Sequence, residues 1–348
     1  MAANKSAQQM SIDGDQPPER FIVRESSFGV LDICPPTASI PVINLSLLTS
    51  SDLSLSSKEE VQELDKLRLA FSSWGCVQVV NHGISNALLE KVLEISKKFF
   101  ALPMEEKNRY ARAIDNFEGY GGDRIVSEKQ VLDWMDRLSL MVFPQDQRKL
   151  NYWPKDPKNF GDVLHEYAVK TKLVMDKLLK AMAKSLNVEE DSFAKKFGDR
   201  AIMKARFCFY PSCPRPDQVL GLKPHSDRSG LTTILQDTEV EGLHVCKDNQ
   251  WFGVIPIPYA IFVNLGDQMQ ILSNGMFKSP LHRVVTNAKT TRRSIAMFNE
   301  PEPEEEIGPV HSLIDEKRPR VYKRVKNYAN FNFESFQKGQ VPLEAMKI

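Results

Sequence analysis

The first half of the chain carries apolar residues at helical spacing. Ser57 opens the clearest run, with Glu60 three residues later as in a capping box, and the apolar positions that follow lie on one face of a helix. The same periodicity predicts helices over about 85–100 and 159–186. Between the first two helices, residues 76–80 form a short apolar run closed by the turn residues 81–83, which is typical of a strand. This half is therefore expected to be mainly helical.

The pattern changes at about residue 202. Short runs rich in β-branched and aromatic residues are now separated by Pro, Gly and Asn, and they cover 206–210, 231–236, 242–245, 251–257, 261–265 and 293–298. Several short strands at this spacing predict a sandwich or barrel and not βαβ units. At the other end of the chain, residues 1–38 are polar with paired prolines and are expected to form a loose arm, followed by a strand at 40–45 and a solvated Ser-rich loop at 46–57.

Composition narrows the class of protein. Lys and Arg number 46 against 45 Asp and Glu, a net charge of +1, so a nucleic-acid partner is not expected. The five cysteines form no CxxC pair, which argues against a disulfide framework or a zinc ribbon and favours a reducing compartment. No apolar run approaches the roughly 18 residues of a membrane span, and the N-terminus lacks a secretory signal. We therefore expect a cytoplasmic protein with no membrane partner. A monomer is also expected, although no residue pattern decides the oligomeric state.

A candidate metal site lies in the β-rich half. His225 and Asp227 are two residues apart, so on a strand their side chains project from the same face. His282 lies far enough along the chain to come from another strand and complete a set of two histidines and one carboxylate. Such a facial triad leaves three positions of an octahedral Fe(II) open. A tetrahedral zinc site of a hydrolase uses similar ligands, so metal-assisted hydrolysis stays an alternative at this point.

A candidate carboxylate receptor follows on the next predicted strand. Arg292 and Ser294 share one face of that strand, and a guanidinium beside a hydroxyl binds a small carboxylate well. Tyr210, shortly before the candidate metal ligands, could supply another hydroxyl. An enzyme that must hold a bidentate co-substrate and dioxygen together could use such a receptor for a carboxylate of the co-substrate, which disfavours the hydrolase alternative.

A series of ordered motifs then resembles a known family. The chain reads Tyr-Pro-Ser-Cys-Pro at 210–214, Gly-Leu-Lys-Pro-His-Ser-Asp at 221–227, Gly-Leu-Thr at 230–232, Val-Asn-Leu-Gly-Asp at 263–267, Ser-Asn-Gly at 273–275, His-Arg at 282–283 and Arg-Arg-Ser at 292–294. Over about residues 38–340 it closely resembles the plant 2-oxoglutarate- and Fe(II)-dependent dioxygenases, of the specialised-metabolism type that includes O-demethylase-like and senescence-related members. Residues 74–83 and 119–121 are also similar to that family's N-terminal region.

The resemblance implies a mixed α+β fold with a double-stranded β-helix, or jelly roll, flanked by helices. It divides the chain into the polar arm at 1–38, a helical and partly β region at 39–198, a jelly-roll catalytic core at 199–305 and a C-terminal segment at 306–348 that packs near the mouth of the active site. Fe(II) would bind to His225, Asp227 and His282, and the distal carboxylate of 2-oxoglutarate to Arg292, Ser294 and Tyr210.

The implied reaction consumes 2-oxoglutarate and O2, with ascorbate as reductant, and releases succinate and CO2 while a small plant metabolite is hydroxylated or O-demethylated. A binding protein that kept the fold without turnover is the alternative. The candidate substrate-binding positions are Arg137, Ser139, Arg206, Arg228, Phe298 and Glu300.

The arginines among these positions suggest the kind of substrate. If two of Arg137, Arg206 and Arg228 face the cavity, the substrate is expected to carry a carboxylate or another anion; each could instead serve in a structural ion pair. Cys208 departs from the asparagine that the family often has, which puts one contact to the metal-side carboxylate of 2-oxoglutarate in doubt.

Overall fold

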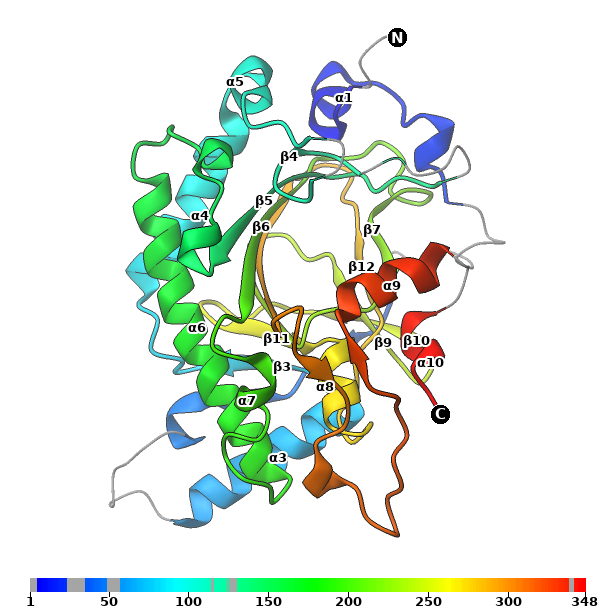
Figure 1. Cartoon of the computed structure of the whole chain (residues 1–348). Helices are drawn as coiled ribbons and strands as arrows, with labels where there is room; N and C mark the ends of the chain where they lie inside the picture. Colours follow the sequence, from blue (N-terminus) through cyan, green and yellow to red (C-terminus); the bar gives the residue numbers. More distant parts are fainter. Residues whose placement is uncertain are drawn as a thin grey trace.

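Two facing β-sheets form the centre of the computed structural model, which describes residues 5–23, 35–48, 57–113, 116–123, 125, 130–337 and 341–348 (Figure 1). The smaller sheet has the order β1 (Thr37–Ala38), β10 (Gln250–Val254), β9 (Leu243–Lys247), β12 (His282–Val285), β7 (Leu220–His225). The larger has the order β2 (Val42–Asn44), β3 (Cys76–Val80), β11 (Ile261–Leu265), β8 (Leu231–Gln236), β13 (Arg292–Glu300), β6 (Ile202–Tyr210), β5 (Asp136–Phe143), β4 (Gly119–Gly121). The predicted jelly roll is confirmed.

The larger sheet crosses the predicted boundary at residue 198. Its strands β2 to β5 come from the region that was expected to be mainly helical, and they pair directly with β11 and β6 of the core. The helical region and the jelly roll therefore share one sheet, and the division at 198/199 stays a prediction. A small separate sheet pairs β14 (Glu306–Ile307) with β15 (Val325–Lys326).

Three long helices pack on the outer face of the larger sheet, α4 (Asn86–Ala101) and α6 (Phe160–Ser185) on the left and α3 (Ser57–Ser73) at the bottom of Figure 1. All three lie where periodicity predicts them. The other helices are short: α1 (Ala7–Asp13), α5 (Met104–Asn108), α7 (Ala194–Phe197), α8 (Asp267–Leu272), α9 (Tyr328–Gln337) and α10 (Pro342–Ala345), with single 3-10 turns at Glu19–Phe21, Leu45–Leu48, Gln145–Gln147, Leu150–Tyr152 and His311–Leu313.

Strand alternation separates the packing core from the site. On β6, Phe207 is fully buried and its ring centroid lies 5.2 Å from that of Phe160 on α6, so this face of the strand packs on the helices. Cys208 and Tyr210, on the opposite face, belong to the cluster between the two sheets. Because successive strand residues point to opposite faces, the even positions of β6 and β13 and the odd positions of β5 face the space between the sheets.

Residues 5–23 are ordered against the body of the protein, unlike the loose arm that their polarity predicted, while 1–4 and 24–34 of that predicted arm lie outside the described residues. Residues 7–13 form α1, whose first turn is capped by the Ser6 hydroxyl accepting from the N–H of Gln9. Met10 is 4% exposed, and Phe21 packs edge-on against Trp134 at 5.2 Å. A few apolar residues within a polar sequence are enough to dock the segment, because the body of the protein offers them a complementary apolar surface.

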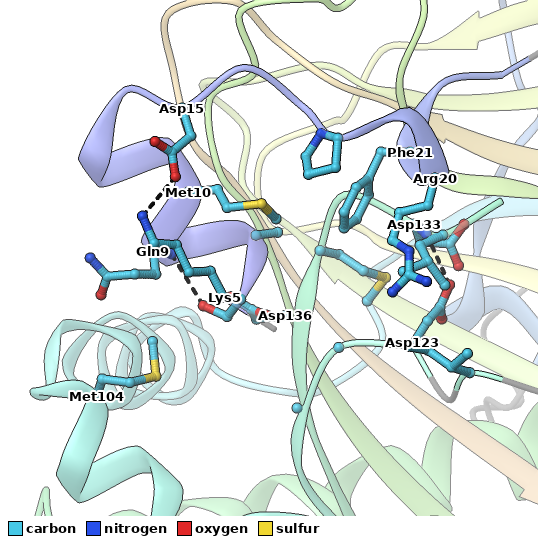
Figure 2. Close-up of a pocket in the computed structure, with 18 of the residues that line it drawn as sticks. Lys5, Gln9, Met10, Asp15, Arg20, Phe21, Met104, Asp123, Asp133 and Asp136 are labelled. Carbon is cyan, nitrogen blue, oxygen red and sulfur yellow. Dashed lines mark hydrogen bonds and ion pairs between the residues drawn. The ribbon is translucent and has the colours of Figure 1, made fainter. Parts of the chain in front are cut away.

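A cavity of about 1090 Å³ lies beside α1 (Figure 2). At the border of this cavity the backbone N–H of Gln8 donates to Oδ2 of Asp136 at 2.9 Å. Lys5, which also lines the cavity, forms an ion pair with Asp15 at 2.8 Å. None of the candidate metal ligands lines it.

The predicted loop at 46–57 begins with a 3-10 turn in which Leu48 is buried, and residues 49–56 lie outside the described residues. Among the described residues, no helix is long and apolar enough to cross a membrane.

Candidate active site

The three predicted metal ligands meet at one end of the smaller sheet. His225 ends β7 and His282 begins β12, and the two residues are direct cross-strand partners. Asp227 lies in the turn just after β7, with its Oδ1 at 3.6 Å from Nε2 of His225 and 3.8 Å from Nε2 of His282. All three ligand atoms lie within 4.8 Å of one another, a spacing that one metal ion can bridge.

Neighbouring groups orient all three side chains. Nδ1 of His225 lies 2.8 Å from the carbonyl oxygen of Lys223, and Nδ1 of His282 lies 3.1 Å from that of Pro280. Because a carbonyl only accepts, each Nδ1 carries the proton and each Nε2 keeps a lone pair for a metal. The side-chain amide of Asn264 donates to Asp227 Oδ2 at 2.8 Å, which leaves Oδ1 facing the histidines.

The electrostatics of the cluster suit a divalent cation. Burial, reinforced by the neighbouring His282, lowers the pKa of His225 to about 4, so this imidazole is neutral at neutral pH. Burial alone would raise the pKa of Asp227, but the two imidazoles and Asn264 outweigh it, so the pKa of this carboxyl lies below its ordinary value. A neutral imidazole and an ionised carboxylate are the forms in which these groups bind metals.

The short helix α8 supports the turn that carries Asp227. The backbone N–H of Asp267 donates to the carbonyl of Asp227 at 2.7 Å, and the side chain of Gln268 donates to the carbonyl of Arg228 at 2.8 Å. A Cβ on Gly266 would lie 2.1 Å from the carbonyl oxygen of Ser229, so only glycine allows α8 to approach the turn so closely.

The predicted carboxylate receptor is buried between the sheets. Arg292 is 3% exposed and is the cross-strand partner of Tyr210, while Ser294 follows two residues later on the same face of β13. One guanidinium nitrogen of Arg292 donates to Gln236 Oε1 at 2.8 Å, whereas its Nε and Nη1 are buried and have no hydrogen-bond partner within the described part of the chain. Burial also raises the pKa of Tyr210, so its hydroxyl remains a donor. These unsatisfied donors fit the carboxylate of a keto acid.

A pocket of about 310 Å³ opens above the metal ligands. Five of the six predicted substrate-binding residues line it: Ser139, Arg206, Arg228, Phe298 and Glu300. Five lining residues were not predicted: Phe117, Lys204, Ala205, Ser226 and Asn332. The sixth, Arg137, is not among the lining residues, and its guanidinium lies 3.4 Å from the carboxylate of Asp123.

Two of the three candidate arginines are held in ion pairs. Arg137 pairs with Asp123, and Arg228 lies 3.4 Å from Glu300, which also pairs with Lys204 at 2.8 Å. Arg206 differs, because within the described residues its guanidinium has neither an ion pair nor a hydrogen bond. It lies 4.8 Å from the ring centroid of Phe298 and keeps its charge, although burial and the neighbouring Arg137 lower its pKa.

Comparison with known proteins places the chain in a family. Residues 40–156 match the N-terminal domain of the non-haem dioxygenases of morphine synthesis, and residues 200–301 match the 2OG-Fe(II) oxygenase superfamily. Protein SRG1 of Arabidopsis thaliana is 39% identical over 89% of this chain and 86% of its own length, and codeine O-demethylase of Papaver somniferum is 39% identical over 82% and 78%. The chain is a plant 2-oxoglutarate- and Fe(II)-dependent oxygenase.

A solved structure agrees with this assignment. The crystal structure of JOX2 in complex with 2OG, Fe and JA matches 99% of this oxygenase and 98% of its own chain, with a TM-score of 0.87 and 30% identity. Fe(II) is therefore the metal of the oxygenase, and 2-oxoglutarate is its co-substrate.

Several functional neighbours in this oxygenase escaped sequence reasoning. Asn264 lies inside the recognised 263–267 motif, but nothing local shows that its amide reaches Asp227. Gln236 ends β8 and is the cross-strand partner of Ser294 on β13, a position that only strand pairing reveals. Lys204 could have been found from alternation, since it is two residues before Arg206 and shares its face. Asn332 comes from α9, and its sequence carries no signal for the pocket.

Proposed function

We propose that this oxygenase hydroxylates or O-demethylates a small plant metabolite that carries a carboxylate. His225, Asp227 and His282 would hold Fe(II), and Arg292, Ser294 and Tyr210 would hold the distal carboxylate of 2-oxoglutarate. The bound metal and keto acid supply oxidation of a substrate C–H bond, with release of succinate and CO2. What the chain itself adds is the position and charge of the groups that orient the substrate.

The unpaired guanidinium of Arg206 is the observation that carries the proposal. It lines the pocket with His225 and Asp227, and no carboxylate among the described residues forms an ion pair with it. Leaving a partly buried cation without a partner costs free energy, so a ligand that supplies the missing charge gains affinity. Ser139, the cross-strand partner of Arg206, adds a hydroxyl beside it.

The remaining charges of the pocket point the same way. Glu300 is the acidic residue that could attract a cationic amine, but Lys204 and Arg228 both pair with it. These two ion pairs hold the pKa of Glu300 below its ordinary value although burial opposes them, so its charge is already used within the wall. The pocket therefore favours acids over amines.

The size of the pocket restricts the acid. Its volume of about 310 Å³ lies at the lower end of the range of ligand pockets and equals the liquid volume of roughly ten water molecules. Phe298 and Phe117 give it two aromatic walls. A compact acid with an aromatic or alicyclic body fits this space better than a glycoside or a peptide.

The test is an anaerobic titration with Fe(II) and 2-oxoglutarate, followed by admission of oxygen and detection of succinate. A panel of compact acids is compared with the methyl ester of each, and His225→Ala serves as the inactive control. Succinate release that acids stimulate and esters do not supports the proposal. Stimulation by esters or amines alone refutes the anionic substrate, and a stable metal complex with no turnover on any compound favours the binding-protein alternative.

Three accompanying expectations rest on the sequence alone. They are ascorbate as reductant, a monomeric state and a location in the cytoplasm. Each stays a prediction.

A further inference from the structure

The C-terminal helix α9 forms part of the wall of the substrate pocket. Asn332, one turn from the start of the helix, lines the same pocket as His225 and Asp227. Figure 1 shows α9 in front of the jelly roll. The position of α9 relative to the metal ligands therefore sets the width of the pocket on this side.

One buried hydroxyl ties the start of α9 to the short helix α8. Tyr328 is 2% exposed, and its hydroxyl donates to Oδ2 of Asp267 at 3.1 Å. Asp267 is itself 1% exposed, so water cannot easily replace the hydroxyl if it is removed. The ring of Tyr328 stacks on Phe331 at 6.0 Å, which leaves its packing independent of the hydroxyl.

The same aspartate also holds the turn that carries a metal ligand. Its backbone N–H donates to the carbonyl of Asp227 at 2.7 Å. Asp267 thus makes one bond to the metal-bearing turn and another to α9, through its backbone and its side chain respectively. Asp267 therefore bonds directly to both sides of the pocket.

We propose that Tyr328 is a positioning residue of the oxygenase. Its hydroxyl, acting through Asp267, fixes α9 against the metal-bearing turn and so sets the geometry of the pocket before substrate binds. Tyr328 lines neither the pocket nor the carboxylate receptor, so it acts on the substrate only through α9. The kinetic part of this inference rests on the proposed function, whereas the structural part does not.

The chain offers a matched control in Tyr322. This tyrosine is also 2% exposed, and its hydroxyl accepts from the side chain of Gln270, which is likewise on α8, at 2.7 Å. The side-chain oxygen of Gln270 accepts from the N–H of Ser279, which lies outside the metal-bearing turn. Tyr322→Phe therefore removes one buried bond to the same helix without cutting the link between Asp227 and α9.

The experiment compares the wild type, Tyr328→Phe and Tyr322→Phe. Amide hydrogen exchange is measured in peptides that cover 328–337, 2-oxoglutarate affinity is measured anaerobically with Fe(II), and KM and kcat are measured with the acid that the succinate screen identifies. Loss of one buried hydrogen bond predicts exchange about three- to tenfold faster in α9 of Tyr328→Phe and a KM raised by a similar factor. We expect kcat and 2-oxoglutarate affinity to stay within about twofold, since only substrate binding is loosened. Tyr322→Phe is expected to leave the exchange of α9 and the KM unchanged.

Three results would overturn the proposal. They are unchanged exchange of α9 in Tyr328→Phe, equal changes in the two variants, and faster exchange of α9 with an unchanged KM. If only esters or amines stimulate succinate release, the anionic substrate is refuted, but the exchange measurement still decides whether the hydroxyl holds α9.

Discussion

Replacing Arg206 with methionine tests the assignment of the substrate pocket most directly. Methionine keeps most of the aliphatic volume beside Phe298 but removes the guanidinium, which has no ion pair or hydrogen bond within the described residues. A structural role and a substrate-binding role of Arg206 predict opposite results for this variant. The structural role requires a loss of stability, and the substrate role requires a loss of activity.

The magnitudes follow from the surroundings of Arg206. No ion pair or hydrogen bond is lost in the free enzyme, among the residues that the structure describes, and the contact with Phe298 is worth about 0.5–2 kcal/mol. Relief of a partly buried, unpaired charge offsets that loss with about 1–3 kcal/mol. The stability of Arg206→Met is therefore expected to equal or exceed that of the wild type. In the complex, a charge-assisted hydrogen bond of about 1.5–3 kcal/mol is lost, which lowers kcat/KM roughly 10- to 150-fold.

The assay combines urea unfolding of the free protein with kcat/KM for an acid and for its methyl ester. Arg206→Met is expected to lose activity toward the acid and to change little toward the ester. Arg228→Met is the matched control, because Arg228 lines the same pocket but its side chain is 40% exposed and already paired with Glu300. Its loss is expected to be smaller, in line with an exposed ion pair.

A clear result would refute the reasoning. If Arg206→Met were destabilised by 1 kcal/mol or more while kcat/KM for the acid stayed within about twofold of the wild type, Arg206 would be a structural residue. The same conclusion would follow if acid and ester lost activity equally.

Three further changes have defined outcomes. Arg292→Met should raise the KM for 2-oxoglutarate at least about tenfold, because it removes two buried hydrogen-bond donors, while the anaerobic affinity for Fe(II) without 2-oxoglutarate stays unchanged. An unaltered KM would contradict the proposed carboxylate receptor. Gly266→Ala should lower the free energy of unfolding by about 2 kcal/mol or more and weaken Fe(II) binding, because the Cβ of the alanine would lie 2.1 Å from the carbonyl oxygen of Ser229. A urea midpoint equal to that of the wild type would show that the turn tolerates the change. Burial raises the pKa of Asp136, so the folded state keeps a proton that the unfolded chain releases above about pH 4, and the free energy of unfolding falls as pH rises through this window. Asp136→Asn, which retains an oxygen for the N–H of Gln8, should make that fall shallower in urea unfolding at a series of pH values, and an unchanged slope would count against it.

Two pairs within the candidate metal site and the candidate carboxylate receptor were accessible from the sequence because the members of each pair are local, whereas His282 and Tyr210 lie far from them along the chain. His225 and Asp227, like Arg292 and Ser294, are two residues apart, and the covalent geometry of a strand places such residues together on one face. The three long helices were accessible for the same reason, since the spacing of apolar residues along one segment fixes the face that is buried. The docking of α1 was not accessible, because Met10 is buried against residues that are distant in the chain.

The sequence by itself therefore determined which side chains could serve the chemistry, and the tertiary structure decided which of them are available. Arg137, Arg206 and Arg228 carry the same charge, and no pattern along the chain separates them. Strand register and the approach of Asp123 and Glu300 from other elements neutralise two of them and leave Arg206 without a partner among the described residues. Spacing within a strand follows from the covalent chain, whereas pairing between strands depends on the packing of the whole fold.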